Sequence, residues 1–421
     1  MKIIKFMGLS VAVIAMPLCT TYSLTAQAYS FNVDSPIPTF GLYCEEEGII
    51  KNGTVKFDLT DLEMFSNKKA VKEAEYIVSG NQAVTFEIPF LSSHIEIPQF
   101  DVTVNGQSVD GQVWYGDNEV RYGGSNSYLN ALSTDNSIIE EKLKRTYSPI
   151  LDETVIGTLY TLTPDTDTIT VTLQLEQPCS YVYDGNNRLT DSSSPDGTQT
   201  WVYENALSQP SYQYFFVGKN IDFTADCGFQ AEAITFKDFI DRNYNSSQEY
   251  YETMGVSIDC LYANANRVLH NKSSMLFSEF FYNSLSRVGL NSYKFTVQLN
   301  GETTIKYSSE VVIQADYSYE PTVYLVGQKQ IGSCPTNYYI SLNSEIPYIV
   351  QSSTDIKKSK TIYTTSSTEN FYFICCSASW ESGLTTAQLA ISTVVGIIGG
   401  IALIVFVVNT VLLIREKKRL R

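Results

Sequence analysis

Histidine is almost absent from this sequence, because the 421 residues include only His94 and His270. A histidine-based metal centre needs several imidazoles close together, so two isolated histidines nearly exclude one. A serine or cysteine hydrolase of the triad type would have to use one of these two residues as its base. We therefore expect no metal ligands and no cofactor, and we assign no catalytic residue.

The motifs of the common enzyme classes are missing as well. The sequence contains no GxSxG nucleophile elbow, no HExxH zinc motif, no Walker loop and no GxGxxG dinucleotide motif. Glycoside hydrolysis is harder to exclude, because it needs only two carboxylates placed across a sugar ring. The chain has 45 Asp and Glu residues, and their order in the sequence does not reveal which two would converge.

Basic residues are scarce between the two ends of the chain. Of the 29 Lys and Arg residues, two lie in the first five positions and five in the last seven. This leaves 22 basic residues against 44 acidic ones, a formal charge of −22. A surface this acidic repels nucleic acid and anionic lipid, and it keeps an exposed protein soluble. We therefore expect no nucleic-acid partner.

Cysteine lacks the spacing of a metal site. After Cys19 the sequence has no CxxC pair, and the remaining cysteines are Cys44, Cys179, Cys227, Cys260, Cys334, Cys375 and Cys376. An exported protein can form disulfides, and an odd number of cysteines leaves at least one thiol unpaired or shared between chains. Disulfides and ordinary buried thiols both fit this pattern, and the sequence leaves the two alternatives open.

One long segment has no charge at all. No residue from Ser382 to Ile414 is charged, and the 26 residues from Leu389 onward would reach about 39 Å as a helix, at about 1.5 Å per residue. A hydrocarbon core is about 30 Å thick, so we expect residues 387–414 to be a tilted transmembrane helix. A GxxxG motif in this segment is a candidate face for helix dimerisation, and it consists of Gly396 and Gly400.

The residues after this segment determine its expected orientation. The tail at 415–421 holds five basic residues and one acid, Glu416. Basic residues remain on the cytoplasmic side of a membrane, so we expect the tail inside the cell and the bulk of the protein outside. The membrane-orienting residues are Arg415, Lys417, Lys418, Arg419 and Arg421.

The N-terminus has the pattern of a secretory signal peptide. The basic start MKIIK is followed by the apolar stretch Phe6–Leu18 and by small residues at Ala26 and Ala28. We expect residues 1–28 to be removed, with Tyr29 as the first mature residue. The two ends together predict a single-pass protein of the cell membrane whose N-terminal region is extracellular.

Short alternating strands dominate the residues between the two ends. The segment FDVTVNGQSVDGQVWYG alternates around an Asn105-Gly106 turn, which is the strongest short-range indication of a hairpin. Similar alternation recurs in VKEAEYIVSG, QAVTFEIPF, VIGTLYTLT and YKFTVQLNGETTIKYSS. Such strands are typical of two-layer antiparallel folds. We expect a mostly β protein with helical insertions, built as tandem Ig-like β-sandwich modules.

Apolar residues three and four apart predict helices in two places, and we expect the last of these helices to end at Gly289. The predicted layout is a β-sandwich at 29–124, a helical connector at 125–150, a second β region at 151–232, a helical insertion at 233–290 and a third β region at 291–380. One alternative joins 151–232 and 291–380 into a single sandwich.

The chain resembles a known class of surface protein in three segments: MKIIK…AQA, FDVTVNGQSVDGQVWYG and VLLIREKKRLR. They are similar to the uncharacterised single-pass surface proteins of Gram-positive bacteria, which have a signal peptide, β-sandwich ectodomains and one C-terminal span. The resemblance is architectural and transfers no catalytic residue. Surface proteins of unicellular eukaryotes share most of these features.

Three functional hypotheses follow. The first is non-catalytic binding or adhesion, or structural presentation of β domains, with an extracellular glycan or protein as ligand. The 29 tyrosines fit it, since Tyr supplies contact area and a hydrogen-bonding group, although half-exposed strands also favour Tyr. The second is a glycosidase-like ecto-enzyme with paired carboxylates. The third is an accessory subunit of a membrane complex, with a homodimer or a membrane partner.

Overall fold

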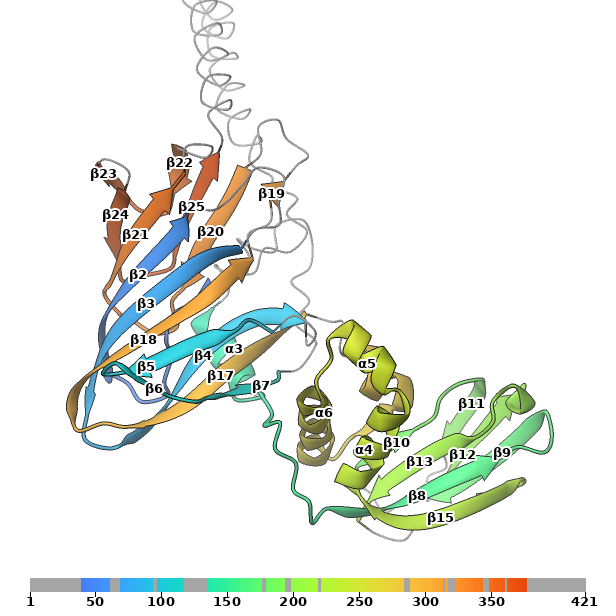
Figure 1. Cartoon of the computed structure of the whole chain (residues 1–421). Coiled ribbons are helices and arrows are strands. Elements are labelled where there is room, and N and C mark those ends of the chain that lie inside the picture. Colours follow the sequence, from blue (N-terminus) through green and yellow to red (C-terminus); the bar gives the residue numbers. More distant parts are fainter. Residues whose placement is uncertain are drawn as a thin grey trace, which may run out of the picture.

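The computed structural model describes a large part of the chain (Figure 1). The described residues are 39–60, 69–93, 97–116, 135–175, 179–193, 198–218, 221–283, 288–312, 315–316, 323–343, 348–359 and 362–376. The predicted signal peptide at 1–28, the predicted span at 387–414 and the tail at 415–421 lie outside them. Among the helices that are described, none is long and apolar enough to cross a membrane.

The protein is mostly β, as the sequence predicts, and its described strands form four sheets, here named A to D. In spatial order, sheet A consists of β22 (Tyr348–Ser352), β25 (Phe371–Cys376), β20 (Val323–Lys329), β1 (Thr39–Phe40), β4 (Ala83–Ser93), β17 (Val288–Gln298) and β7 (Gln112–Trp114), with β19 (Ala315–Asp316) beside β20. Sheet B consists of β23 (Lys357–Ser359), β24 (Ile362–Ser367), β21 (Thr336–Leu342), β2 (Ile50–Leu59), β3 (Lys69–Gly80), β18 (Gly301–Val312), β5 (Phe100–Val104) and β6 (Gln107–Ser108). Sheets A and B share one apolar core and form the large sandwich.

In both sheets of the large sandwich, strands from the start of the described chain lie next to strands from its end. β1 lies between β20 and β4, and β2 lies between β21 and β3. The β1–β20 and β2–β21 pairs are parallel, which departs from the purely antiparallel pairing expected. β17 pairs along its whole length with β4, and β18 does so with β3. The third predicted β region therefore belongs with the first, and the alternative that joins it to 151–232 is wrong.

A second unit lies in the chain between β7 and β17. Its sheet C consists of β15 (Gly228–Thr235), β8 (Ile156–Thr163), β13 (Tyr212–Val217), β10 (Tyr181–Tyr183) and β16 (Ser274–Leu276). Its sheet D consists of β11 (Arg188–Ser193), β12 (Thr198–Glu204), β9 (Thr168–Gln174) and β14 (Asp222–Ala225). The two sheets enclose a core rich in tyrosine. The second sandwich is thus inserted into the first, whereas the sequence predicts modules in tandem.

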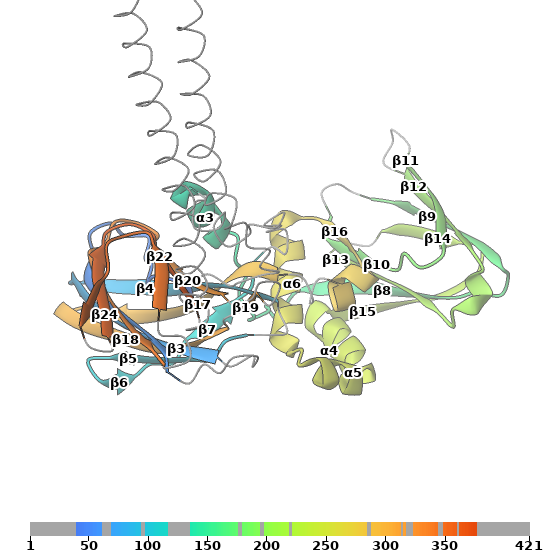
Figure 2. The same cartoon turned by 90° about the horizontal axis from the view of Figure 1, so that it is seen from above.

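Helices cover the other face of sheet C. They are α4 (Phe236–Ser246), α5 (Gln248–Met254) and α6 (Ile258–Asn271), and the π-helical turn η2 (Glu279–Asn283) follows β16. A short 3-10 turn, η1 (Ala206–Ser208), joins β12 to β13. Figures 1 and 2 both show α6 between the two sandwiches. The Nδ2 of Asn266 in α6 donates to the backbone carbonyls of Ser148 and Ile150, at 2.7 and 2.8 Å, so α6 binds the segment that enters the second unit.

Two local predictions have opposite outcomes. The Asn105-Gly106 hairpin turn is confirmed, because both residues have positive φ, as a tight hairpin turn requires. The predicted helix end at Gly289 is wrong, since Gly289 is a strand residue of β17 and pairs with Ser92. The helix α6 ends at Asn271, where Lys272 takes the left-handed conformation that commonly terminates helices.

Another helix, α3 (Asn136–Leu143), covers part of the outer face of sheet A. It lies in the predicted connector, and the Asp135 side chain caps its first turn. Its apolar side chains pack on residues from β1, β4 and β17: the helix contributes Ile139 and Leu143, and the strands contribute Phe40, Leu91 and Leu290. This packing buries one end of that face.

A lysine lies in the core of the large sandwich. Lys72 is 1% exposed, and its Nζ donates to the Phe40 carbonyl at 2.6 Å and to the Tyr307 hydroxyl at 3.1 Å. The Tyr307 ring stacks on Tyr76, whose hydroxyl accepts a bond from Gln328. No carboxylate contacts Lys72 among the bonds of the described residues, and burial lowers its pKa to about 7.

The buried lysine makes stability depend on pH. Lys72 loses its proton near pH 7 when folded but near pH 10.4 when unfolded. Between these values the unfolded state binds more protons, so the free energy of unfolding rises with pH by up to about 1.4 kcal/mol per unit. We expect Lys72→Met to remove this rise in denaturant unfolding of the detergent-solubilised full chain between pH 7 and 10. Lys56→Met, at an exposed position of β2, is the control and should keep it; equal slopes for wild type and Lys72→Met would contradict the assignment.

Candidate functional site

Several residues singled out from the sequence lie outside the described part of the chain. They are the signal-cleavage residues Ala26, Ala28 and Tyr29, the candidate helix-dimer residues Gly396 and Gly400, and the basic tail of Arg415, Lys417, Lys418, Arg419 and Arg421. Their predicted roles concern export and anchoring and stay predictions. The described residues bear on what the exported part can bind or catalyse.

The cysteines are placed in three different environments. Cys44, Cys334 and Cys375 belong to the core of the large sandwich, Cys179 and Cys227 to that of the second, and Cys260 to α6. Cys376 is the last residue of β25. Of these, Cys44, Cys179, Cys227, Cys260 and Cys334 are free thiols. Burial raises the pKa of Cys44 to about 11 and also that of Cys260, so neither is the thiolate that nucleophilic chemistry needs.

Two carboxyl groups in the described part of the second unit have a raised pKa. Burial raises the pKa of Asp184 to about 6, and its carboxylate accepts a bond from the Gln213 backbone N–H. Burial also raises the pKa of Asp259. Asp184 follows β10, whereas Asp259 lies in the first turn of α6. These two groups occupy different elements of the second unit, and no described group of three or more His, Cys, Asp and Glu residues could hold a metal ion.

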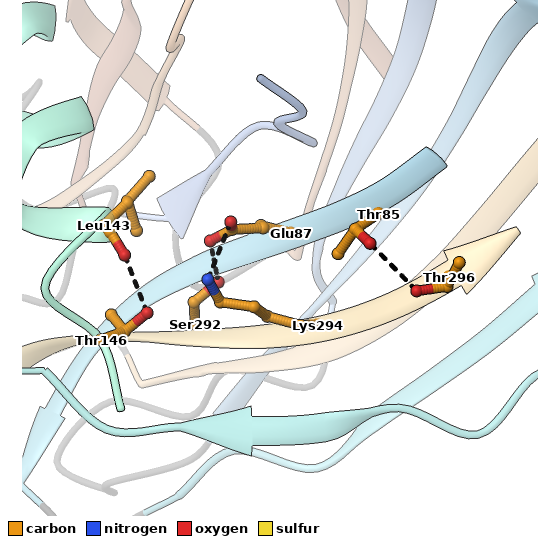
Figure 3. Close-up of polar contacts among 7 residues, drawn as sticks. All are labelled: Thr85, Glu87, Leu143, Thr146, Ser292, Lys294 and Thr296. Atoms are coloured by element: carbon orange, nitrogen blue, oxygen red, sulfur yellow. Dashed lines mark hydrogen bonds and ion pairs between the residues drawn. The ribbon is translucent and has the colours of Figure 1, made fainter. Parts of the chain in front are cut away.

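A buried polar cluster lies on the outer face of sheet A, where β4 meets β17 (Figure 3). The Glu87 carboxylate accepts from the Lys294 Nζ at 2.9 Å and from the Ser292 hydroxyl at 2.8 Å. The Lys294 ammonium lies over the Trp114 ring, 4.5 Å from its centroid. Glu87 and Lys294 are directly opposite each other in the β4–β17 ladder. Each charged group therefore has partners, and the cluster holds three strands together.

This cluster is closed to ligands by its surroundings. The side chains of Glu87 and Lys294 are 9% and 14% exposed. Tyr43 exchanges two backbone hydrogen bonds with Glu87, at 2.9 and 2.8 Å. Near α3, the Thr146 hydroxyl donates to the Leu143 carbonyl (Figure 3). We interpret the cluster as a structural ion pair, not as a catalytic site.

The outer face of sheet B is open and polar. Six neighbouring strands, β24, β21, β2, β3, β18 and β5, lie side by side there (Figure 1). Their register aligns outward side chains in two rows across the sheet. The first row is Ser366, Asn337, Thr54, Glu75, Lys306 and Thr103, and the second is Thr364, Tyr339, Lys56, Glu73, Ser308 and Asp101. At about 4.8 Å between strands, each row spans about 24 Å.

The first hollow on this face has a volume of about 470 Å³. Its lining is almost entirely polar: Asn337, Tyr339, Thr354, Asp355, Lys357, Thr364, Thr365 and Ser366. Thr365 is held in place, because its hydroxyl donates to the Asp355 carbonyl at 2.8 Å. Tyr339 is 39% exposed. The side chains of Asn337, Tyr339 and Asp355 make no hydrogen bond to another described residue, so their polar groups are available to a ligand.

The second hollow lies at the other end of the same rows and has a volume of about 380 Å³. It is lined by Thr54, Lys56, Glu73, Ala74, Glu75, Asp101, Thr103, Lys306, Tyr307 and Ser308. Lys56 pairs with Glu73 at 3.3 Å and Lys306 with Glu75 at 2.6 Å. Each of these two carboxylates is therefore exposed and ion-paired to a lysine of the same face.

The charge of this face is nearly balanced. The two hollows contain Lys56, Lys306 and Lys357 against Glu73, Glu75, Asp101 and Asp355, while the whole chain has a net charge of −16. The side chains of the two hollows therefore provide no large local excess of either charge. Hydroxyl, amide and carboxylate groups around an exposed phenol ring suit a polar, nearly neutral ligand.

Comparison with known proteins adds no assignment. No family model matches this chain, and no curated protein matches its sequence. We therefore infer a site from the geometry of the described residues.

The tyrosines of the segment NYNSSQEYYETM lie in the second unit and not on the outer face of sheet B. Tyr244 of α4 and Tyr251 of α5 stack on each other. Tyr339 is not part of that segment. It follows Tyr338 directly in β21. Adjacent strand residues point to opposite faces, so one of the two tyrosines had to face solvent.

The buried pair of Glu87 and Lys294 has a matched exposed counterpart in Glu75 and Lys306. Lys294→Met leaves a carboxylate buried without its cation, and we expect a loss of about 3 kcal/mol in the free energy of unfolding. Lys306→Met removes a pair whose side chains are 57% and 43% exposed, and we expect a change within about 1 kcal/mol. Denaturant unfolding followed by Trp fluorescence measures both. Equal losses would show that the Glu87 cluster is not a buried structural pair.

Proposed function

We propose that this protein is a membrane-anchored extracytoplasmic surface protein that binds a nearly neutral, polar ligand on the outer face of sheet B. The ligand class that we infer is an oligosaccharide. The observation that carries the proposal is the pair of adjoining polar hollows, aligned on the same two rows of outward side chains.

The chemistry of the first hollow supports a sugar over other ligands. Pockets for drug-sized apolar molecules are lined mainly by hydrophobic side chains, whereas this one offers hydroxyls, an amide, a carboxylate and an ammonium. A pyranose ring presents hydroxyls at its rim and C–H groups on its faces. The Tyr339 ring gives the C–H face an apolar surface, and Asn337 and Asp355 can bond the hydroxyls.

The length of the face supports a chain of sugars over a single sugar. Lys56 of the second hollow lies directly opposite Tyr339 of the first in the β2–β21 pair, and opposite Glu73 in β3. A linear ligand lying along the second row would contact all three side chains. Several weak contacts then add up along one molecule, which is how shallow sites reach useful affinity.

The location in this proposal comes from the two ends of the chain. The proposal includes export by the signal peptide at 1–28, anchoring by a helix at 387–414 and a cytoplasmic tail at 415–421. It also includes Ig-like character for the β modules. These parts rest on the sequence patterns and on the resemblance to single-pass surface proteins.

The test is binding of the full chain, in detergent micelles, to an array of neutral oligosaccharides. We expect Tyr339→Ala to weaken binding of the best ligand about ten-fold, because a stacking surface is lost, a difference of about 1.4 kcal/mol. Tyr250→Ala, an exposed tyrosine of α5 in the second unit, should bind like the wild type. Titration calorimetry gives both dissociation constants. No binding by the wild type, or equal losses in both variants, would overturn the proposal.

A further inference from the structure

One edge strand of the second unit is long and open. β15 is the outermost strand of sheet C and pairs only with β8 among the described strands. It has eight residues, whereas the other described edge strands have two to six. The residues from Gly228 to Ala233 are all exposed. Such a strand presents a free row of backbone N–H and C=O groups.

The usual protections of an edge strand are missing from β15. Natural edges are blunted by lysine, proline, bulges or short length, but GFQAEAIT contains no lysine or proline, and its register with β8 is regular. Its one charge, Glu232, is neutralised by Arg242 of α4 through two bonds of 2.7 Å. The edge is therefore locally neutral in a chain of charge −16.

We propose that β15 pairs antiparallel with the β15 of a second copy of this chain, joining the two C sheets across a two-fold axis. Phe229 and Ala231 share the face of sheet C that carries Leu162 and Tyr160, which line the sandwich core. Glu232 shares the opposite face, which carries Leu159 and the helices. A two-fold axis perpendicular to the sheet keeps these faces continuous, so residues of the same face lie opposite each other.

One register fits the side chains. With Ala231 opposite Ala231 of the partner subunit, Phe229 lies opposite the partner's Ala233, and Gln230 lies opposite the partner's Glu232. A large side chain then meets a small one, and an amide meets a carboxylate. Phe229, 41% exposed in one copy, gains cover while it keeps its contact with the Phe223 ring.

The neighbouring registers fit less well. Centring the pair on Glu232 places two carboxylates opposite each other, which is unfavourable. Centring it on Gln230 leaves Ala233 and Ile234 beyond the ladder and shortens the pairing. Of the three registers, the one centred on Ala231 is therefore the longest in which no two like charges lie opposite each other.

Cysteine cross-linking tests this register. Directly opposite Cα atoms in an antiparallel pair are about 4.5–5.5 Å apart, within the range of a disulfide. We expect full-length Ala231→Cys in detergent to form a disulfide dimer when air and copper phenanthroline oxidise the paired thiols. The wild-type chain, treated in parallel, reports any dimer that comes from the native cysteines.

A matched substitution separates the register from random collision. Ala233→Cys alters the same face of the same strand, but the new thiol of each copy is offset by four residues, about 13 Å, from its counterpart in the other copy. We expect no dimer from Ala233→Cys alone and a dimer when it is mixed with Phe229→Cys. Equal cross-linking by Ala231→Cys and Ala233→Cys, or none by Ala231→Cys, would overturn the proposal, as would cross-linking of Ala231→Cys only to a different protein.

Charge at position 230 provides a readout without cross-linking. Gln230→Glu places two carboxylates opposite each other at two symmetric points, and Gln230→Lys places opposite charges there. We expect the dimer dissociation constant, measured by analytical ultracentrifugation, to rise about ten-fold for the first and to fall several-fold for the second. A wild-type chain that stays monomeric at all concentrations, or equal constants for the two variants, would contradict the pairing.

Discussion

The pairing of the β17–β18 hairpin with β4 and β3 is the interaction on which the large sandwich depends. Each of the two hairpin strands completes one sheet, and β17 also brings Lys294 to Glu87 across the ladder. β4 and β17 are separated by the whole second unit in the sequence. β3 and β4 pair with β2 and β1 within the first part of the chain, but each lacks its second partner until residues 288–312 are available. Such non-local pairing carries a large loop-closure cost, which a compact inserted unit reduces because it holds its own ends in place.

Alternation in the sequence predicts strands and hairpins well, since it depends only on neighbouring residues. The turns at Asn105-Gly106 and Gly301 follow from the glycine and asparagine at those positions. Pairing partners could not be predicted in the same way. A period of two indicates which residues share a face, but it does not indicate that β2 lies parallel to β21, some 280 residues later.

Lys72 and Tyr339 show what the alternation in the sequence predicts and what it does not. In VKEAEYIVSG, the face with Ala74, Tyr76 and Val78 is the more apolar, and it includes Lys72. The pattern thus implies a buried lysine, but only the structure supplies the Phe40 carbonyl and Tyr307 hydroxyl that make its burial possible. Likewise, the sequence implies that Tyr338 or Tyr339 faces outward, yet the hollow beside Tyr339 needs the loop at Thr354 and Asp355, which comes from another part of the chain.

The insertion point has a mechanical consequence. β7 and β17, which lead into and out of the second unit, are neighbours in sheet A, and Trp114 pairs with Ser292. A force that pulls the second unit away from β25 passes through sheet A. It crosses β17, β4, β1 and β20 in turn. Within the described residues, β1 contributes Thr39 and Phe40 to this path, and the corresponding strand of sheet B, β2, contributes ten residues. The same pull also loads sheet B, which presents the polar face, because the chain continues from β17 into β18 and β18 pairs with β3 along its whole length.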